Sequence, residues 1–306
     1  MKKLFVIGNG FDCYLHDLPT KYSNFRTYLL SRFPHIEEYY MIPGSTQMPK
    51  GEEVYDEEEV AGYVISILNS CGGDEWSNLE SYLGADVFDF IEENLPKVTL
   101  EDESYKDVYL NEDLSRDIKE TFVTVKKLFA EWVNEELSTL NYIPLSNVAD
   151  IIEGDNYFLN FNYTYTLEEA YGIKEVCHIH GQIGNEPDAI YFGHGDDEDY
   201  PESLQTMGAE DALGELKRDL RKDTMRALAE NKSFFERLDD VEVIYSFGFS
   251  FSEVDRVYLD RISKKVKPGT IWYFNSYAWD EAQAGKTDYL KVLEVYDFEV
   301  KVENRW

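Results

Sequence analysis

Two glycines, an amide and a carboxylate follow the first apolar run of the chain, in a pattern typical of a nucleotide contact. The run KLFVIG (3–8) leads into Gly8, Asn9 and Gly10, and Asp12 comes shortly after. Glycine lets a ligand approach the backbone because it has no Cβ. The segment lacks the third glycine of the dinucleotide fingerprint and the Gly-Lys-Ser/Thr of a P-loop. We expect these four residues to bind a nucleotide. A tight turn in which Asp12 caps a backbone group is the alternative.

A second polar group follows the expected strand 156–162, in the stretch FLNFNYTYTLEEAYG (158–172). Asn160 and Asn162 share one face of this strand because strand side chains alternate. Asn162 lies at the carboxyl end, where open α/β sheets bind their ligands. We expect Asn162 to hold a ribose hydroxyl or to orient a water. Alternatively, Asn162 or Thr164 is the N-cap of the next helix.

Histidines precede glycines at two places in the chain. His178 and His180 share one face of the expected strand 176–181, and His180 comes directly before Gly181. An imidazole titrates near neutral pH, with an ordinary pKa of about 6.5, so His180 is a candidate general base. His194, in FGHGDD, repeats the pattern and is a second candidate. We interpret His178 as a core histidine bound to backbone groups.

The His-x-His spacing is also compatible with a metal site. His178 and His180 would need a third ligand, for which Asp12 and Glu80 are candidates. A metal-dependent hydrolase, including a nuclease, is therefore an alternative, although we expect no metal.

A serine-rich turn joins an apolar run to a helical pattern in YSFGFSFSEVDRVY (245–258). Gly248, Ser250, Ser252 and the free N–H groups of the following helix suit a phosphate or a ribose. Ser252 and Asp255 have the spacing of a capping box, which we prefer to a ligand contact for Asp255.

Apolar runs rich in β-branched and aromatic residues alternate with helical patterns along much of the chain. Such alternation predicts an α/β fold with a mostly parallel, Rossmann-like sheet and helices on both faces. We expect Thr20 to cap the first helix. Strands are expected at 3–8, 156–162, 176–181, 189–193, 241–249 and 270–277, with an edge strand at 292–302, and helices at 21–32, 163–171 and 253–265.

The segment from about 34 to 150 departs from this alternation. It contains an acidic loop and two long helical patterns, so we interpret 34–150 as a helical insertion into a core formed by 1–33 and 151–306. The acidic loop is expected at 51–60, the helical patterns near 75–94 and 113–140, and a further helical region at about 209–237.

The chain is strongly acidic, with a formal net charge of −32. Without a basic stripe, broad binding to nucleic acid is not expected. Cys13, Cys71 and Cys177 are too scattered for a disulfide framework or a zinc ribbon. No apolar run has the length of a membrane span. We expect a cytoplasmic protein that binds a small nucleotide, does not bind membranes and could form a homo-oligomer.

Several of these stretches together resemble the bacteriophage abortive-infection AbiH family. The matching pieces are LFVIGNGFD, LPTKYSNF, WSNLE, FLNFNYTYTLE, HIHGQIG and FGFSFSEVD, from Leu4 to about Leu259. The family is similar, more distantly, to the sirtuin-like NAD-binding fold. The resemblance implies a role in phage defence, with an unknown phage trigger as partner.

The sirtuin-like similarity also implies roles for particular residues. Asn162 corresponds to the asparagine of the sirtuin Thr-Gln-Asn-Ile-Asp motif, and His180 to the histidine of its catalytic His-Gly. Thr164 replaces the aspartate of that motif, and the cysteine pairs of the sirtuin zinc module are missing, so protein deacylation is not expected. The glycine turn of sirtuins corresponds to Gly8, Asn9 and Gly10, and their late ribose site to Gly248 and Ser250.

Taken with the resemblance, these residues lead us to expect a nucleotide hydrolase that acts on NAD in infected cells. Asn162 would fix the ribose and the attacking water, and His180 would take the proton. A metal-dependent hydrolase and a non-enzymatic sensor that binds a nucleotide are the alternatives.

Overall fold

The computed structural model describes residues 2–36, 41–51, 53–73, 76, 78–98, 105–201, 203–275 and 298–303. The chain forms two compact units. The first unit comprises Met1–Thr20, Val133–Tyr191 and Asp223–Trp306, and the second comprises Lys21–Trp132 and Phe192–Lys222.

The second unit differs in extent from the insertion expected at 34–150. It begins at Lys21, ends its first segment at Trp132 and adds the segment Phe192–Lys222. Its two segments share a core, in which the rings of Phe129 and Phe192 stack with centroids 3.9 Å apart. Packing between residues distant in sequence thus determines this unit, and local sequence patterns do not report such packing.

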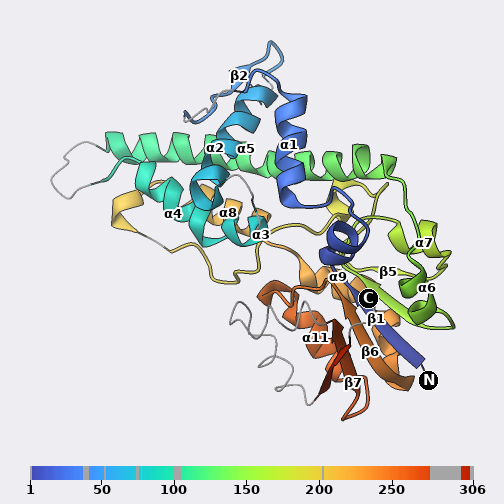
Figure 1. The fold of residues 1–306 in the computed structure, drawn as a ribbon. Helices are drawn as coiled ribbons and strands as arrows, with labels where there is room; N and C mark the ends of the chain where they lie inside the picture. Colours follow the sequence, from blue (N-terminus) through green and yellow to red (C-terminus); the bar gives the residue numbers. More distant parts are fainter. Residues whose placement is uncertain are drawn as a thin grey trace. The chain divides into compact units, whose positions relative to one another are not determined.

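A six-stranded sheet forms the centre of the first unit, with the strand order β5-β4-β1-β6-β7-β8 (Figure 1). Every neighbouring pair in it is parallel, which confirms the expected α/β class with a parallel sheet. The strands are β1 (Lys2–Ile7), β4 (Tyr157–Asn160), β5 (Cys177–His178), β6 (Val241–Phe247), β7 (Ile271–Asn275) and β8 (Glu299–Glu303).

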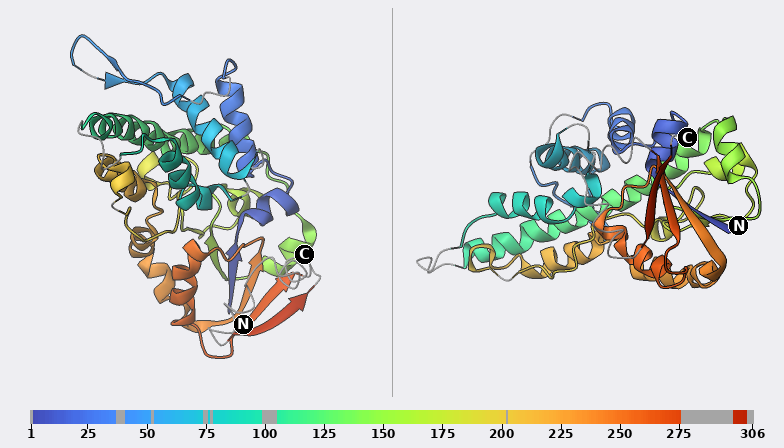
Figure 2. Two further views of the ribbon diagram at one scale, coloured as in Figure 1. Left: turned by 90° about the vertical axis from the view of Figure 1, so that its left-hand side faces the viewer. Right: turned by 60° about the horizontal axis from the view of Figure 1, so that its bottom comes forward.

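Both faces of this sheet are covered by helices. Side chains alternate along β1, so Leu4 and Val6 enter one apolar cluster while Phe5 and Ile7 enter another. The first cluster includes side chains of α9 (Thr224–Glu230), α10 (Lys232–Glu236) and α11 (Arg256–Ser263). The second includes side chains of α6 (Ser146–Ile152) and α7 (Thr166–Tyr171). Figure 2 shows the C-terminal strands, in orange and red, side by side from two further directions.

The expected strand at 189–193 is wrong. Pro187–Ala189 form a short 3-10 helix, and Gly193 has a φ of +140°. The apolar run crosses the boundary between the two units after Tyr191, so its residues are divided between two cores. The expected strand at 176–181 is reduced to the two residues of β5, whereas β8 confirms the edge strand within its described residues.

Helices dominate the second unit, as the sequence predicts, but one of them lies partly in the expected acidic loop. Helix α2 (Glu57–Gly72) begins there because the Asp56 carboxylate accepts the N–H groups of Glu58 and Glu59. Acidic residues in its first turn also favour the helix dipole. The other main elements are α1 (Tyr22–Arg32), β2 (Thr46–Gln47), β3 (Glu53–Val54), α3 (Leu79–Tyr82), α4 (Ala85–Asn94), α5 (Lys106–Glu135, whose last residues belong to the first unit) and α8 (Glu210–Leu220).

Two expected caps are not formed. The N-cap position of α1 is Lys21 instead of Thr20. The hydroxyl of Ser252 donates to the Asp255 carboxylate, 2.9 Å away, and makes no capping bond to the backbone. In the described part of the chain, no helix combines the length and the apolar character needed to cross a membrane.

Candidate functional site

The loops after β1 and β6 are packed against each other through glycines. Gly8 N–H donates to Phe247 O at 2.9 Å, and Gly10 N–H donates to Gly248 O at 3.0 Å. A Cβ on Gly8 would lie 2.5 Å from Gly248 O. On Gly248, which has a φ of +61°, it would lie 2.2 Å from the backbone nitrogen of Phe11. These glycines therefore allow two backbone segments to meet, a role that does not require a ligand.

Gly248→Ala is expected to reduce the free energy of unfolding by at least about 2 kcal/mol, because positive φ and a backbone clash both oppose the methyl group. The matched control is Gly269→Ala, since Gly269 has a φ of +75° and nothing within 4 Å of its Cβ position. Urea unfolding of both variants measures the difference. Equal losses would show that the two loops do not need to approach so closely.

Two predicted ligand residues in these loops are exposed, one after β1 and one after β6. Asn9 and Ser250 both face solvent, whereas Gly8 is buried and Gly10 and Gly248 are half-buried. The Asn9 side-chain amide donates to Thr20 O at 2.9 Å, which holds its orientation. Asn9 and Ser250 are therefore two polar side chains that a ligand could reach after these glycine turns.

Asp12 is fully buried in a five-residue π-helix, Phe11–Leu15, which follows the first glycines. Thr164 Oγ1 donates to its carboxylate at 2.5 Å and Thr166 Oγ1 at 2.7 Å. Burial raises the pKa of Asp12 to about 6, although hydrogen bonds from Thr164, Thr166 and Asn162 oppose the rise. A buried carboxylate with a raised pKa is a candidate functional group. The role of Thr166 was not anticipated, although Thr-x-Thr spacing after a strand was a usable signal.

Asn162 joins three strands of the sheet at their carboxyl ends. Its side-chain amide donates to Gly8 O at 3.1 Å, after β1. Its backbone N–H donates to Asn160 Oδ1 at 3.0 Å, in β4. Its carbonyl lies 3.2 Å from Nδ1 of His178, in β5. The alternative in which Asn162 or Thr164 caps α7 is wrong, because Tyr165 occupies that N-cap position.

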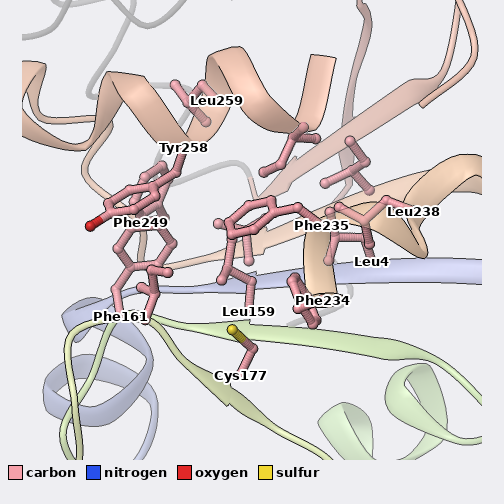
Figure 3. Close-up of a cluster of buried hydrophobic side chains, with 14 of the residues drawn as sticks. Leu4, Leu159, Phe161, Cys177, Phe234, Phe235, Leu238, Phe249, Tyr258 and Leu259 are labelled. Atoms are coloured by element: carbon pink, nitrogen blue, oxygen red, sulfur yellow. The ribbon is translucent and has the colours of Figure 1, made fainter. Parts of the chain in front are cut away.

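His180 is buried next to a carboxylate and two aromatic rings. Its Nε2 lies 3.3 Å from Asp255 Oδ1, and its side chain is only 4% exposed. The rings of Phe161 and Tyr258 are 5.1 and 5.6 Å from the imidazole, centroid to centroid. Figure 3 shows Phe161, Phe249 and Tyr258 next to one another in the apolar cluster on this face. The pairing with Asp255 was missed because the sequence suggested a helix cap for that residue.

His178 has different surroundings, so the two histidines do not share a face as expected. Its Nδ1 faces Asn162 O, and its Nε2 lies 2.7 Å from Glu168 Oε1, on α7. Both ring nitrogens thus face acceptors, as expected for a histidine that holds the structure together. Among the residues that the structure describes, no group of three or more His, Cys, Asp and Glu side chains is arranged to hold a metal ion.

His194 and Glu80 belong to the second unit, where both have structural partners. His194 Nδ1 accepts from Asp196 N–H at 3.2 Å, so Nε2 carries the proton and donates to Lys217 O at 2.9 Å. Burial lowers the pKa of His194. The Glu80 carboxylate lies 3.0 Å from Lys222 Nζ, whose side chain is 2% exposed. This geometry supports a buried ion pair and a core histidine there.

A surface groove in the first unit lies away from the predicted site residues. Its lining includes Ala149 on α6, Glu153 at the end of that helix, and Ala170 and Tyr171 on α7. None of the predicted site residues lines it, so the groove gives no support to a ligand site around His180.

The chain matches a known protein family over most of its length. The family described as "Bacteriophage abortive infection AbiH" matches residues 4–276. That range includes the glycine turns after β1 and β6. It also includes Asp12, Asn162, His178, His180 and Asp255. No curated protein and no solved structure shows a significant match to the chain. The match over most of the sequence confirms the AbiH resemblance, and the chain belongs to the bacteriophage abortive infection AbiH family.

Proposed function

We propose that this chain is a phage-defence protein whose first unit binds and hydrolyses a nucleotide, with NAD as the first substrate to test. The strand order carries the proposal. Counted along the chain, the strands of the sheet lie in the order 3-2-1-4-5-6. This is the order of the Rossmann dinucleotide-binding folds, which bind their ligand at the carboxyl ends of strands 1 and 4.

Strands 1 and 4 of that count are β1 and β6, and the predicted ligand residues follow both. The exposed side chains of Asn9 and Ser250 would contact the nucleotide, while Gly8, Gly10 and Gly248 hold the two loops together. Asp12 lies below this edge, where its carboxylate fixes the π-helix to the segment after β4. A sirtuin-like arrangement is consistent with this placement.

In the proposed reaction, a water attacks the ribose carbon that bears nicotinamide. A carbon–oxygen bond forms, the glycosidic bond breaks, and nicotinamide leaves with the bonding electron pair as a neutral molecule. His180 accepts the proton from the water and releases it to solvent. Asn162 holds the backbone around the reacting sugar by its bond to Gly8 O.

A nucleotide sensor without turnover is the second candidate, and the burial of His180 favours it. A side chain that is 4% exposed would need a change in its surroundings before it could reach a substrate. The close packing of the glycine loops favours the same view, because backbone N–H groups of Gly8 and Gly10 already have protein acceptors.

The test is nicotinamide release from NAD by the purified protein, with and without a lysate of phage-infected cells. We expect release by the wild type, and a loss of roughly 10²- to 10⁴-fold in His180→Ala, as is usual when a general base is removed. His35→Ala, which replaces an exposed histidine, is the matched control and should retain the wild-type rate.

Circular dichroism and thermal unfolding check that His180→Ala is folded. Release at the wild-type rate by folded His180→Ala would remove His180 from the mechanism. Bound but intact NAD in every mixture would instead support the sensor.

A further inference from the structure

Thr20 carries a buried hydroxyl group that the fold does not use. The residue is 7% exposed, and it does not cap α1, because Lys21 occupies that N-cap position. Among the residues that the structure describes, none offers Thr20 Oγ1 a hydrogen-bond partner. A buried polar atom without a partner is destabilising, so its presence calls for an explanation. Valine has nearly the same shape, which means that packing alone does not explain a threonine here.

The exposed side chain of Asn9 lies directly beside Thr20. Its Nδ2 donates to Thr20 O at 2.9 Å, and both residues belong to the first unit. Asn9 faces solvent in the glycine turn after β1. The amide oxygen, Oδ1, can accept a hydrogen bond in addition to the one that Nδ2 donates. An exposed acceptor and a buried hydroxyl therefore lie together at the edge of the sheet where a nucleotide is expected.

The chemistry of this pair favours a sugar hydroxyl over a phosphate. An amide oxygen only accepts hydrogen bonds, and an ionised phosphate also offers only acceptors, so Asn9 Oδ1 needs a donor on the ligand. A ribose hydroxyl is such a donor. The Thr20 hydroxyl both donates and accepts, so it can bind the same sugar from its second side.

We propose that Asn9 and Thr20 bind the ribose in the ADP half of the nucleotide. The exposed Asn9 amide makes the first contact. A rotation of Thr20 about χ1 exchanges its methyl and hydroxyl groups and turns Oγ1 toward the sugar. The proposed reaction requires the nicotinamide ribose beside His180, which leaves the other ribose for this pair. The inference rests on the nucleotide binding of the proposed function, but not on hydrolysis.

The first test is the Kd of the full chain for NAD, measured by isothermal titration calorimetry. Thr20→Val removes one neutral hydrogen bond and should weaken binding by roughly 3- to 10-fold. Its free energy of unfolding should equal or exceed that of the wild type, because the lost hydroxyl has no partner in the free chain. Thr20→Ser keeps the hydroxyl and should bind NAD more tightly than Thr20→Val.

Thr206→Val is the matched control. Thr206 is 1% exposed and its hydroxyl also has no partner in the described part of the chain, but it belongs to the second unit. This variant should leave the Kd for NAD unchanged. An unchanged Kd in folded Thr20→Val, or an equal loss in Thr206→Val, would overturn the proposal.

Asn9→Ala tests the same contact from the exposed side, and it does so even if Thr20→Val fails to fold. It should weaken NAD binding by roughly 3- to 10-fold. In the double variant, the combined loss should be smaller than the product of the two single losses, because both side chains bind one sugar. Unchanged binding by Asn9→Ala would contradict the pair.

The sugar itself is tested with ADP and with 2′,3′-dideoxy-ADP, which lacks both ribose hydroxyls. The wild type should bind ADP more tightly by roughly 3- to 10-fold, and Thr20→Val should bind the two ligands more nearly equally. Equal binding of the two ligands by the wild type would overturn the assignment of the ribose.

The measurements separate this inference from the proposed hydrolysis. Weaker NAD binding by Thr20→Val, with no nicotinamide released by the wild type, would support the ribose contact and contradict the hydrolase. Nicotinamide release with the same KM in the wild type and Thr20→Val would support the hydrolase and overturn the ribose contact. A wild type that binds neither NAD nor ADP would overturn both.

Discussion

Asp12→Asn is expected to stabilise the protein at neutral pH, and to stabilise it less as the pH falls. Burial raises the pKa of Asp12 from 3.8 to about 6 in the folded chain. The folded state therefore binds the Asp12 proton more tightly than the unfolded state does. The contribution of Asp12 to the free energy of unfolding is greatest at low pH and is lost as the pH rises to about 6. The whole effect amounts to about 3 kcal/mol.

Asparagine removes this charge and keeps the shape of the side chain. Its oxygen can accept from one threonine hydroxyl, and its amide can donate to the other. We expect Asp12→Asn to stabilise the protein more at pH 8 than at pH 5, by about 1.4 kcal/mol. This is the part of the Asp12 contribution that is lost between pH 5 and pH 8. Urea unfolding of both proteins at the two pH values gives this difference.

Other titrating groups cancel in that comparison because both proteins contain them. Asp188→Asn is a suitable control, since Asp188 is exposed and its replacement should change stability equally at both pH values. A gain that is independent of pH would show that Asp12 is already neutral or is solvated in the folded state. A stabilised but inactive Asp12→Asn would indicate that the charge is retained for function.

Glu80→Gln is expected to destabilise the second unit by about 3–5 kcal/mol, the usual cost of removing one partner of a buried ion pair. Its carboxylate contacts Lys222 Nζ at 3.0 Å, and the lysine side chain is 2% exposed. Lys222 would then keep a buried charge with weaker compensation. Combining Glu80→Leu with Lys222→Met should recover most of the loss, because neither charge is then buried.

The matched control for Glu80→Gln is Glu57→Gln, in the same unit. Glu57 pairs with Lys127 at 3.1 Å, but the two side chains are 50% and 53% exposed. The expected cost is therefore below about 1 kcal/mol. Urea unfolding of all three variants and the wild type gives the comparison, and equal losses for Glu80→Gln and Glu57→Gln would contradict a special role for the buried pair.

The sequence predicts the central strands because burial on both faces produces continuous apolar runs, as in KLFVIG before Gly8. It also predicts that polar residues after β1, β4 and β6 meet at one edge, since parallel strands end on the same side. The run at 189–193 looks equally strand-like, but the chain passes from one unit to the other after Tyr191. No local pattern distinguishes these two cases.

The contacts of the candidate site residues were predicted less well than the strands that these residues follow. The Asp255 spacing to Ser252 indicated a cap, and only the fold shows that the carboxylate faces His180. The glycines after β1 indicated an open ligand cradle, whereas the backbone after β6 fills the space next to them. Partners that are distant in sequence decide both points, so residue types and spacing within one segment could not reveal them.

The most direct test of the central claim is NAD measured in phage-infected bacteria that express either the wild-type chain or His180→Ala at equal levels. We predict that NAD falls after infection only with the wild type, and that only the wild type limits phage production. Constant NAD in protected wild-type cells, or equal protection by His180→Ala, would contradict the proposed hydrolysis.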